Sequence, residues 1–186
     1  MVSLTALLLP IVLSTVLVFI VSAIIHMALP YHRKDLGKLP NEDAVIEALR
    51  AAGVSKGDYM FPHADSMKHA GSPEMTAKFE RGPAGIMSVF PPGPPKMTTG
   101  LVLWFIYCLV ISVFAAYLAG RTLPSGTDYL AVFRVVGAAS FLAYGIGQLP
   151  DSIWRGQSWC TTAKNVFDGL VYGLVTAGTF GWLWPA

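Results

Sequence analysis

The chain has 186 residues, of which 54% are hydrophobic and only 13% are charged. A water-soluble domain carries about 25% charged residues, so this composition excludes an ordinary soluble domain and predicts a membrane protein. The net charge of +2 is not accompanied by a basic stripe with interleaved aromatic residues, which excludes a nucleic-acid partner. The two cysteines, Cys108 and Cys160, are too few for a disulfide framework and lack the CxxC spacing of metal ligands.

Four apolar segments predict an all-α membrane protein, a bundle of four transmembrane helices. The first helix is expected within residues 1–29, where the run Leu4–Leu29 contains no Asp, Glu, Lys or Arg. This run exceeds the roughly 20 residues that span a bilayer. It also lacks the basic start and the short apolar core, about 7–15 residues, of a signal peptide, so we expect it to remain uncleaved. Residues 99–186 are expected to hold the other three spans, at about 99–119, 129–149 and 165–184.

Residues 30–98, between the first and second spans, are predicted to form a small extramembrane α+β cap. This segment holds most of the charge of the chain, nine of the thirteen Lys and Arg and eight of the eleven acids. A helix is expected at 41–52, with Asn41 as the N-cap and Gly53 as the C-terminal stop. Short strands are expected at 58–61 and 86–90, where apolar residues are bounded by Gly and Pro.

The basic residues near the span ends predict the orientation of the chain. Arg33, Lys34, Lys38 and Lys96 flank the first loop, whereas Arg121 alone lies close to the span ends on the opposite side. The positive-inside rule therefore predicts that loop 30–98 is cytoplasmic and that the N- and C-termini are outside, in the cell (inner) membrane. The C-terminal run DGLVYGLVTAGTFGWLWP resembles small bacterial inner-membrane proteins. This resemblance covers about one helix and implies no activity.

One face of the last predicted span consists of small residues. Gly169, Gly173, Ala177 and Gly181 recur every four residues and so lie along the same side of the helix. Small residues at this spacing allow another helix backbone to approach closely, which favours association in lipid. The pattern predicts a helix-packing face, and either another helix of this chain or a second protein can occupy it.

The predicted spans contain few polar side chains, and His26, Arg134, Asp168 and Tyr172 are the candidates for function. An acid within a span is costly and indicates a functional hypothesis with a specific partner. Asp168 lies about three residues, or roughly 5 Å, inside its span, and His26 lies at a similar depth. A His26–Asp168 hydrogen bond is geometrically allowed, either as a proton relay or as a structural tie. Alternatively, Lys164, four positions earlier, neutralises Asp168 near the interface. Arg134 lies nearer the opposite end, so a pair with Asp168 is not expected.

No catalytic, cofactor or metal site is predicted. His63 and His69 lie in a methionine-containing loop that has suitable donors for Cu(I), but their spacing matches no common ligand pattern. These two residues and Asp65 are also the weak candidates for an enzymatic site in the cap.

Two functions from different classes therefore remain. The first is an accessory, assembly or interaction subunit of a membrane complex, with a membrane-protein partner or self-association in the lipid bilayer. The alternative is a small proton-linked transporter or channel that uses His26 and Asp168.

Overall fold

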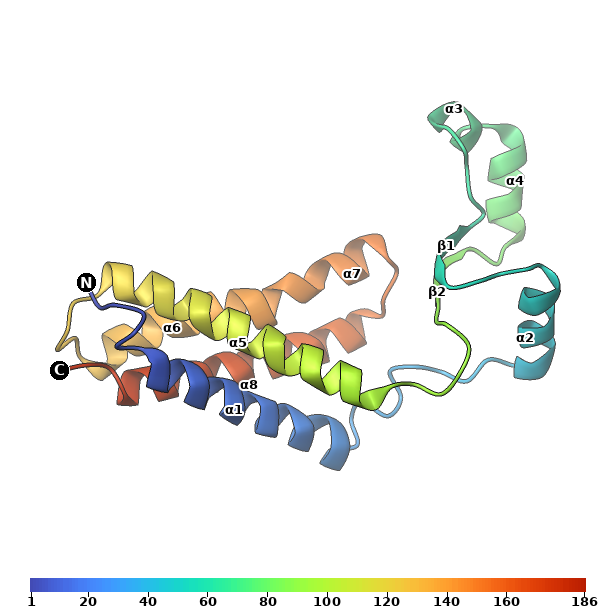
Figure 1. Cartoon of the computed structure of the whole chain (residues 1–186). Coiled ribbons are helices and arrows are strands. Elements are labelled where there is room, and N and C mark those ends of the chain that lie inside the picture. Colours follow the sequence, from blue (N-terminus) through green and yellow to red (C-terminus); the bar gives the residue numbers. More distant parts are fainter. The chain divides into compact units, whose positions relative to one another are not determined.

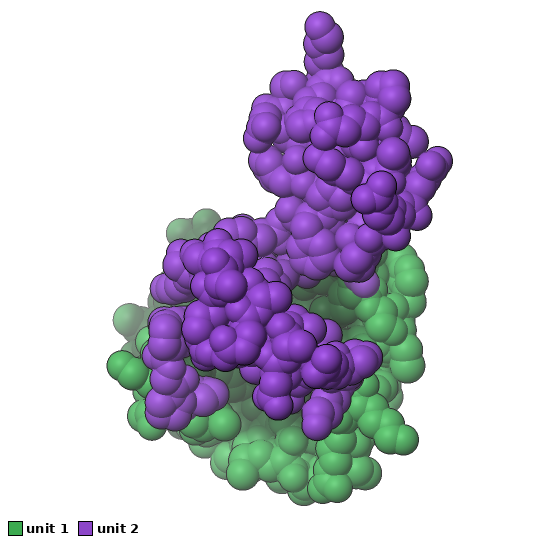
Figure 2. All heavy atoms as spheres, turned by 90° about the vertical axis from the view of Figure 1, so that its right-hand side faces the viewer, with its two compact units in different colours: residues 1–35, 96–152, 157–186 green, residues 36–95, 153–156 purple.

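The computed structural model describes residues 1–186, which form two compact units (Figure 2). The helical unit comprises Met1–Asp35, Lys96–Ser152 and Gln157–Ala186. The cap unit comprises Leu36–Pro95 together with Ile153–Gly156. Each unit is described by itself.

Three helices of the helical unit are long and apolar enough to cross a membrane. The first continues from α1 into a π-helical turn η1, and the third continues from α6 through a short 3₁₀ turn η2 into α7. Their bounds are Leu8–Ala23 for α1, Ile24–Ala28 for η1, Met97–Thr122 for α5, Tyr129–Tyr144 for α6, Ile146–Gln148 for η2 and Leu149–Trp154 for α7. Three of the predicted spans are thereby confirmed as helices of membrane-crossing length, and the prediction of a membrane-embedded protein is confirmed with them.

The fourth long helix, α8 (Trp159–Trp182), begins earlier than the predicted span at 165–184 and lies beside α1 and α6 (Figure 1). It is less apolar than the other three, because its sequence includes Asp168 and many glycine and threonine residues. Most of these polar and small residues are buried inside the helical unit. The other helices of the unit therefore cover most of the polar and small residues that make α8 less apolar.

The small-residue face of α8 packs against α6. A Cβ added at Gly169 would lie 2.4 Å from the Cα of Gly145, and one added at Gly173 would lie 3.2 Å from the backbone N of Phe141. Farther along, Gly181 faces the ring of Tyr129 at the start of α6. Residues closer to the C-terminus of α8 therefore contact residues closer to the N-terminus of α6. The two helices are antiparallel neighbours over most of their length. The sequence left open whether another helix of this chain or a second protein packs against this face. In the structure, a helix of the same chain, α6, packs there.

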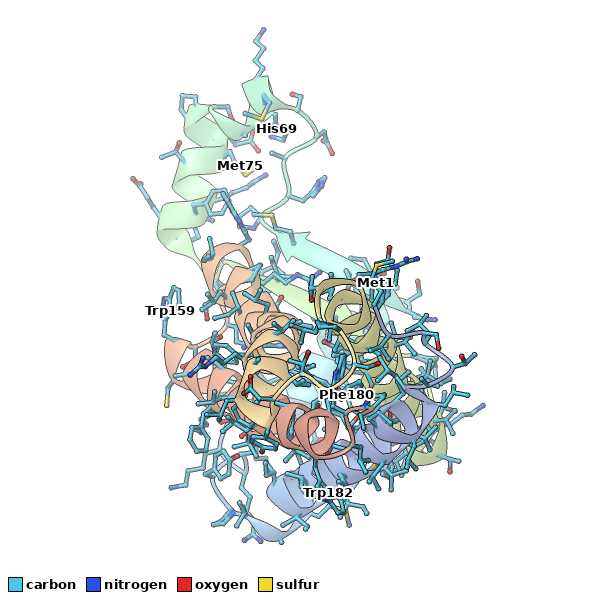
Figure 3. All side chains as sticks on the ribbon, turned by 90° about the vertical axis from the view of Figure 1, so that its left-hand side faces the viewer. Met1, His69, Met75, Trp159, Phe180 and Trp182 are labelled. Atoms are coloured by element: carbon cyan, nitrogen blue, oxygen red, sulfur yellow. The ribbon has the colours of Figure 1, made fainter.

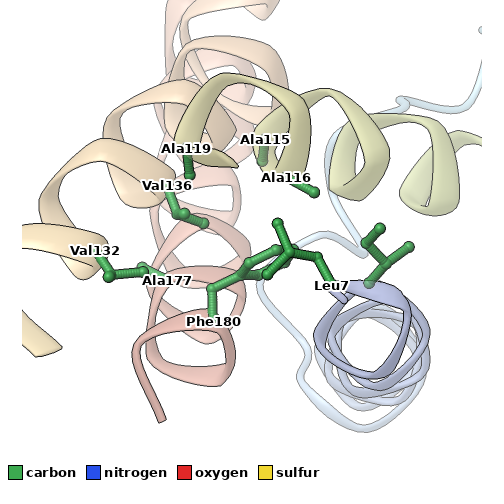
Figure 4. Packing of buried hydrophobic residues seen from close by; sticks show 9 residues of the cluster. Leu7, Ala115, Ala116, Ala119, Val132, Val136, Ala177 and Phe180 are labelled. Atoms are coloured by element: carbon green, nitrogen blue, oxygen red, sulfur yellow. The ribbon is translucent and has the colours of Figure 1, made fainter. Parts of the chain in front are cut away.

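A compact apolar cluster lies at the end of the helical unit that carries both chain termini (Figure 4). Leu7, Ala116, Val136 and Phe180 come from four different helical segments, and each is 3% exposed or less. Trp182, two residues after Phe180, is directed outward (Figure 3) and is 75% exposed. The alanines and valines of the cluster allow the helices to approach closely around one large ring.

The cap unit contains the two predicted strands and three helices. Strand β1 (Gly57–Phe61) pairs antiparallel with β2 (Gly85–Val89), which confirms the small two-stranded sheet. The helices are α2 (Glu42–Ala51), α3 (Met67–Ala70) and α4 (Pro73–Arg81). Met75 of α4 is the one buried residue between positions 36 and 95 (Figure 3).

Helix α2 ends as the sequence predicts but begins differently. Gly53 has a φ of +70° and follows the last turn, where the N–H of Val54 donates to the carbonyl of Leu49 at 3.0 Å. This pairing is the Schellman arrangement that favours glycine. Asn41 occupies the predicted N-cap position, but its backbone is left-handed and its side chain makes no cap hydrogen bond.

Candidate functional site

Six polar residues of the helical unit gather at the end of the first span, and we call them the polar cluster. They come from three segments: the turn η1, residues 30–35, and the first half of α8. Residues 30–35 are held in tight turns by two backbone hydrogen bonds, Arg33 N–H to Pro30 O and Asp35 N–H to His32 O. The members of the polar cluster are His26, Tyr31, His32, Asp35, Lys164 and Asp168.

Asp168 is the buried centre of the polar cluster. It is 3% exposed, and its two carboxylate oxygens have different partners. The Tyr31 hydroxyl donates to Oδ1, and Nε2 of His32 donates to Oδ2 at 2.8 Å. A buried carboxylate is tolerated only when hydrogen bonds or charges replace water, and these two donors provide that replacement. Burial and the neighbouring Asp168 carboxylate also raise the pKa of Tyr31, so the hydroxyl keeps its proton as a donor.

His32 connects Asp168 to a second carboxylate. Its Nδ1 lies 2.6 Å from Oδ2 of Asp35, so both ring nitrogens face carboxylate oxygens. A doubly protonated imidazolium donates to both, whereas a neutral ring donates to only one. Lys164 hydrogen-bonds the other oxygen of Asp35 and donates to the Tyr31 carbonyl at 2.7 Å. The hydrogen bonds from Lys164 and His32 lower the pKa of Asp35.

His26 joins the polar cluster through His32. The two rings are stacked, with centroids 4.7 Å apart and planes 6° apart. Nδ1 of His26 lies 3.0 Å from the Ser22 carbonyl of its own helix. The direct His26–Asp168 hydrogen bond that the sequence allows is not made, because His32 occupies the place beside the carboxylate. Even so, ligand atoms of His26, His32 and Asp168 all lie within 4.8 Å of one another.

One turn beyond Asp168 on α8, Tyr172 is buried among aromatic rings. Its ring centroid lies 6.0 Å from that of Trp104 and 5.5 Å from that of Tyr144. Its hydroxyl is buried without a hydrogen-bond partner, and so is Oγ of Ser140 on α6. Unpartnered buried hydroxyls are unusual in folded proteins and are commonly satisfied by ordered water.

Arg134 and the cap histidines lie outside the polar cluster. Arg134 is exposed on α6 and makes no ion pair. In the cap unit, Asp65 lies 3.6 Å from His63 and 3.8 Å from His69, in loose and exposed contacts. Neither set has the burial or the directed hydrogen bonds found around Asp168.

Sequence reasoning singled out His26, Asp168 and Tyr172 but missed the residues that connect them. Tyr31, His32 and Asp35 follow the first span in a polar stretch with no motif. The one available signal was the i,i+3 spacing of His32 and Asp35, which places them on the same side of a turn. Lys164 was expected to neutralise Asp168 from four positions away, but it bonds Asp35 instead.

The three apolar helices define a membrane-embedded, mostly helical protein, with a polar cluster at the end of its first span. No protein-family pattern, curated protein or solved structure matches the chain.

Proposed function

We propose that α8 is the fourth membrane span and that the four long helices form a transmembrane bundle. With 24 residues, α8 is about 36 Å long at 1.5 Å per residue, enough to cross the hydrocarbon core. Its contacts with α6 supply the main support. Because α6 belongs to a segment of membrane-crossing length and the pair runs antiparallel from Gly169 to Gly181, α8 lies at the same depth.

The proposed bundle has both termini on one side of the membrane. An even number of spans requires this, and the N–H of Gly126 donates to the Pro185 carbonyl at 2.9 Å, which puts the C-terminus beside the α5–α6 connection. The basic residues around loop 30–98 favour a cytoplasmic cap and outside termini in the inner membrane of a bacterial cell.

Within this architecture, the chain acts as an accessory or interaction subunit of a membrane complex. The observation that carries this proposal is the composition of the cap unit. Its single buried residue, Met75, contrasts with Leu36, Met67 and Phe90, which are 92%, 91% and 82% exposed. Small units stabilise themselves poorly when they bury little apolar surface, and large exposed apolar side chains mark binding sites. We therefore infer that the cap unit binds a partner membrane protein with an extramembrane part on the same side.

Site-specific photocrosslinking in native membranes tests this role. A crosslinking amino acid at Phe90 is expected to give one discrete adduct with a membrane protein, whereas the same group at exposed Glu80 serves as the matched control. The complex is expected to survive mild detergent and to dissociate when Met67 and Phe90 are both replaced by serine. A monodisperse monomer from native membranes, with adducts to lipid alone, would overturn the proposal.

A second candidate, a small transporter or channel for protons or other cations, is favoured by the interior of the helical unit. Asp168 is buried there, and the hydroxyls of Tyr172 and Ser140 lack partners within the chain. Such groups provide hydrogen-bonding positions for a permeating ion or its water. Cation flux into liposomes is expected to be abolished by Asp168→Asn and retained by Asp128→Asn, because asparagine also serves well as the N-cap of α6. Equal flux from both variants would exclude this candidate.

A further inference from the structure

Each histidine of the polar cluster has one ring nitrogen fixed by an oxygen acceptor. Nδ1 of His26 lies 3.0 Å from the Ser22 carbonyl, and Nδ1 of His32 lies 2.6 Å from the Asp35 carboxylate. Histidines that bind metals usually donate their second N–H to a carboxylate or a backbone carbonyl, which fixes the ring and leaves the other nitrogen for the metal. Both histidines thus have an oxygen acceptor at Nδ1, and their two rings stack on each other.

The remaining donors of the three residues lie close together. With Nδ1 engaged, Nε2 is the available nitrogen of His26, and Nε2 of His32 already lies 2.8 Å from Oδ2 of Asp168. One ring nitrogen of each histidine and one carboxylate oxygen of Asp168 lie within 4.8 Å of one another. A tetrahedral ion with bonds of about 2.0–2.1 Å needs ligand atoms about 3.4 Å apart. The 2.8 Å pair of His32 and Asp168 therefore opens slightly, the widest pair closes by up to about 1.4 Å, and the His26 ring turns out of its stack on His32. His26 is exposed on the last turn of the first span, where a rotation of its side chain displaces no buried group.

From this arrangement we infer that His26, His32 and Asp168 form a binding site for a divalent transition-metal ion. Two imidazoles and one carboxylate are ligands that suit zinc and its neighbours, and three protein ligands leave a further position open. The ion replaces the proton between His32 and Asp168. Tyr31 remains bonded to Oδ1 of Asp168 and thereby directs Oδ2 toward the ion.

The charges around the site fit a divalent cation. Asp168 and Asp35 contribute two negative charges and Lys164 one positive charge, with both histidines neutral in the metal-bound form. Lys164 also holds Asp35 in place, so that Asp35 acts as a positioning residue for His32. The inference concerns the helical unit and is independent of the proposed role of the cap unit, although it names a ligand for the transport candidate.

The test uses the full-length chain without a histidine tag, in lipid nanodiscs, after removal of metal with a chelator. Zn²⁺ binding is measured by competition with a chromophoric chelator, and Co²⁺ absorption reports the ligand geometry. We expect one Zn²⁺ per chain. His26→Ala and Asp168→Asn are each expected to weaken binding by about 100-fold or more, and Asp35→Asn by about 10-fold, as for loss of an outer partner.

The matched control is the double variant His63→Ala/His69→Ala, which removes the exposed cap histidines and is expected to bind Zn²⁺ like the unmodified chain. His26→Ala is the decisive variant, because the one hydrogen bond of His26 lies within its own helix, so its loss is expected to leave the fold intact. The inference is overturned if the folded chain binds no added Zn²⁺ or if His26→Ala binds Zn²⁺ with unchanged affinity. It is also overturned if the His63→Ala/His69→Ala variant no longer binds Zn²⁺. Zn²⁺ binding is measured separately from cation flux and from partner crosslinking. Failure of the proposed interaction role or of the transport candidate therefore does not change how the binding result is interpreted.

Discussion

Gly169→Ala tests whether direct backbone contact between α6 and α8 holds the helical unit together. The added Cβ would lie 2.4 Å from the Cα of Gly145 and 2.6 Å from the carbonyl carbon of Tyr144, about 1 Å closer than ordinary van der Waals contact. Both neighbours are backbone atoms, so the two helices must move apart. Overpacking of this kind costs about 1–3 kcal/mol, and the better helix propensity of alanine returns about 1 kcal/mol. We expect a net loss of up to about 2 kcal/mol in the free energy of unfolding.

Alanine variants at two further glycines serve as references for the change in stability at Gly169. At Gly173 the added Cβ would lie 3.2 Å from Phe141 N, which a shift of a few tenths of an ångström relieves, so Gly173→Ala is expected to be nearly neutral. At Gly100 in α5 nothing lies within 4 Å, so Gly100→Ala is expected to stabilise the chain by about 0.5–1 kcal/mol. Reversible unfolding in mixed micelles, followed by circular dichroism, ranks the three variants. If Gly169→Ala is as stable as Gly100→Ala, the α6–α8 contact is not the close packing described.

Three other measurements examine different parts of the chain. Because the pKa of Asp35 is lowered in the folded protein, its bonds with Lys164 stabilise at neutral pH and are lost as pH falls below about 4. Asp35→Asn is therefore expected to lower the thermal midpoint at pH 7, and the difference should shrink on acidification; a constant difference would contradict this. Ser14 and Ser112 share a buried hydrogen bond of 2.6 Å, for which a double-alanine cycle is expected to give a coupling of about 0.6 kcal/mol, and no coupling would refute the contact. Met75→Ala is expected to increase hydrogen exchange throughout the cap unit while the helical unit stays protected, and unchanged exchange would show that Met75 is not its core.

The sequence predicted most of the helical unit because lipid imposes long, uncharged segments, as at Leu8–Ala28 and Met97–Thr122. It also predicted the strands of the cap unit, which have apolar residues between turn residues. Helices α3 and α4 were missed. Their N-cap serines, Ser66 and Ser72, each accept a backbone N–H, but both segments are short and polar.

The site was harder to predict than the fold because it depends on a turn that returns to a distant helix. Asp168 and His26 were found because a polar side chain in an apolar segment is conspicuous. His32 lies in a polar stretch, where a histidine gives no signal of a functional site. Only the folded turn brings it between Asp168 and Asp35. The pairing of Lys164 with Asp35, 129 residues apart, has no local signal at all.

The low hydropathy of α8 also bears on how the chain enters a membrane. A helix that turns its acid, glycines and threonines toward its neighbours has little affinity for lipid by itself. In the proposed four-helix bundle, α8 instead depends on α6, whose residues Phe141 and Tyr129 face Gly173 and Gly181. In the proposed bundle, the fourth span is therefore held in lipid by its packing against α6 and not by its own hydropathy.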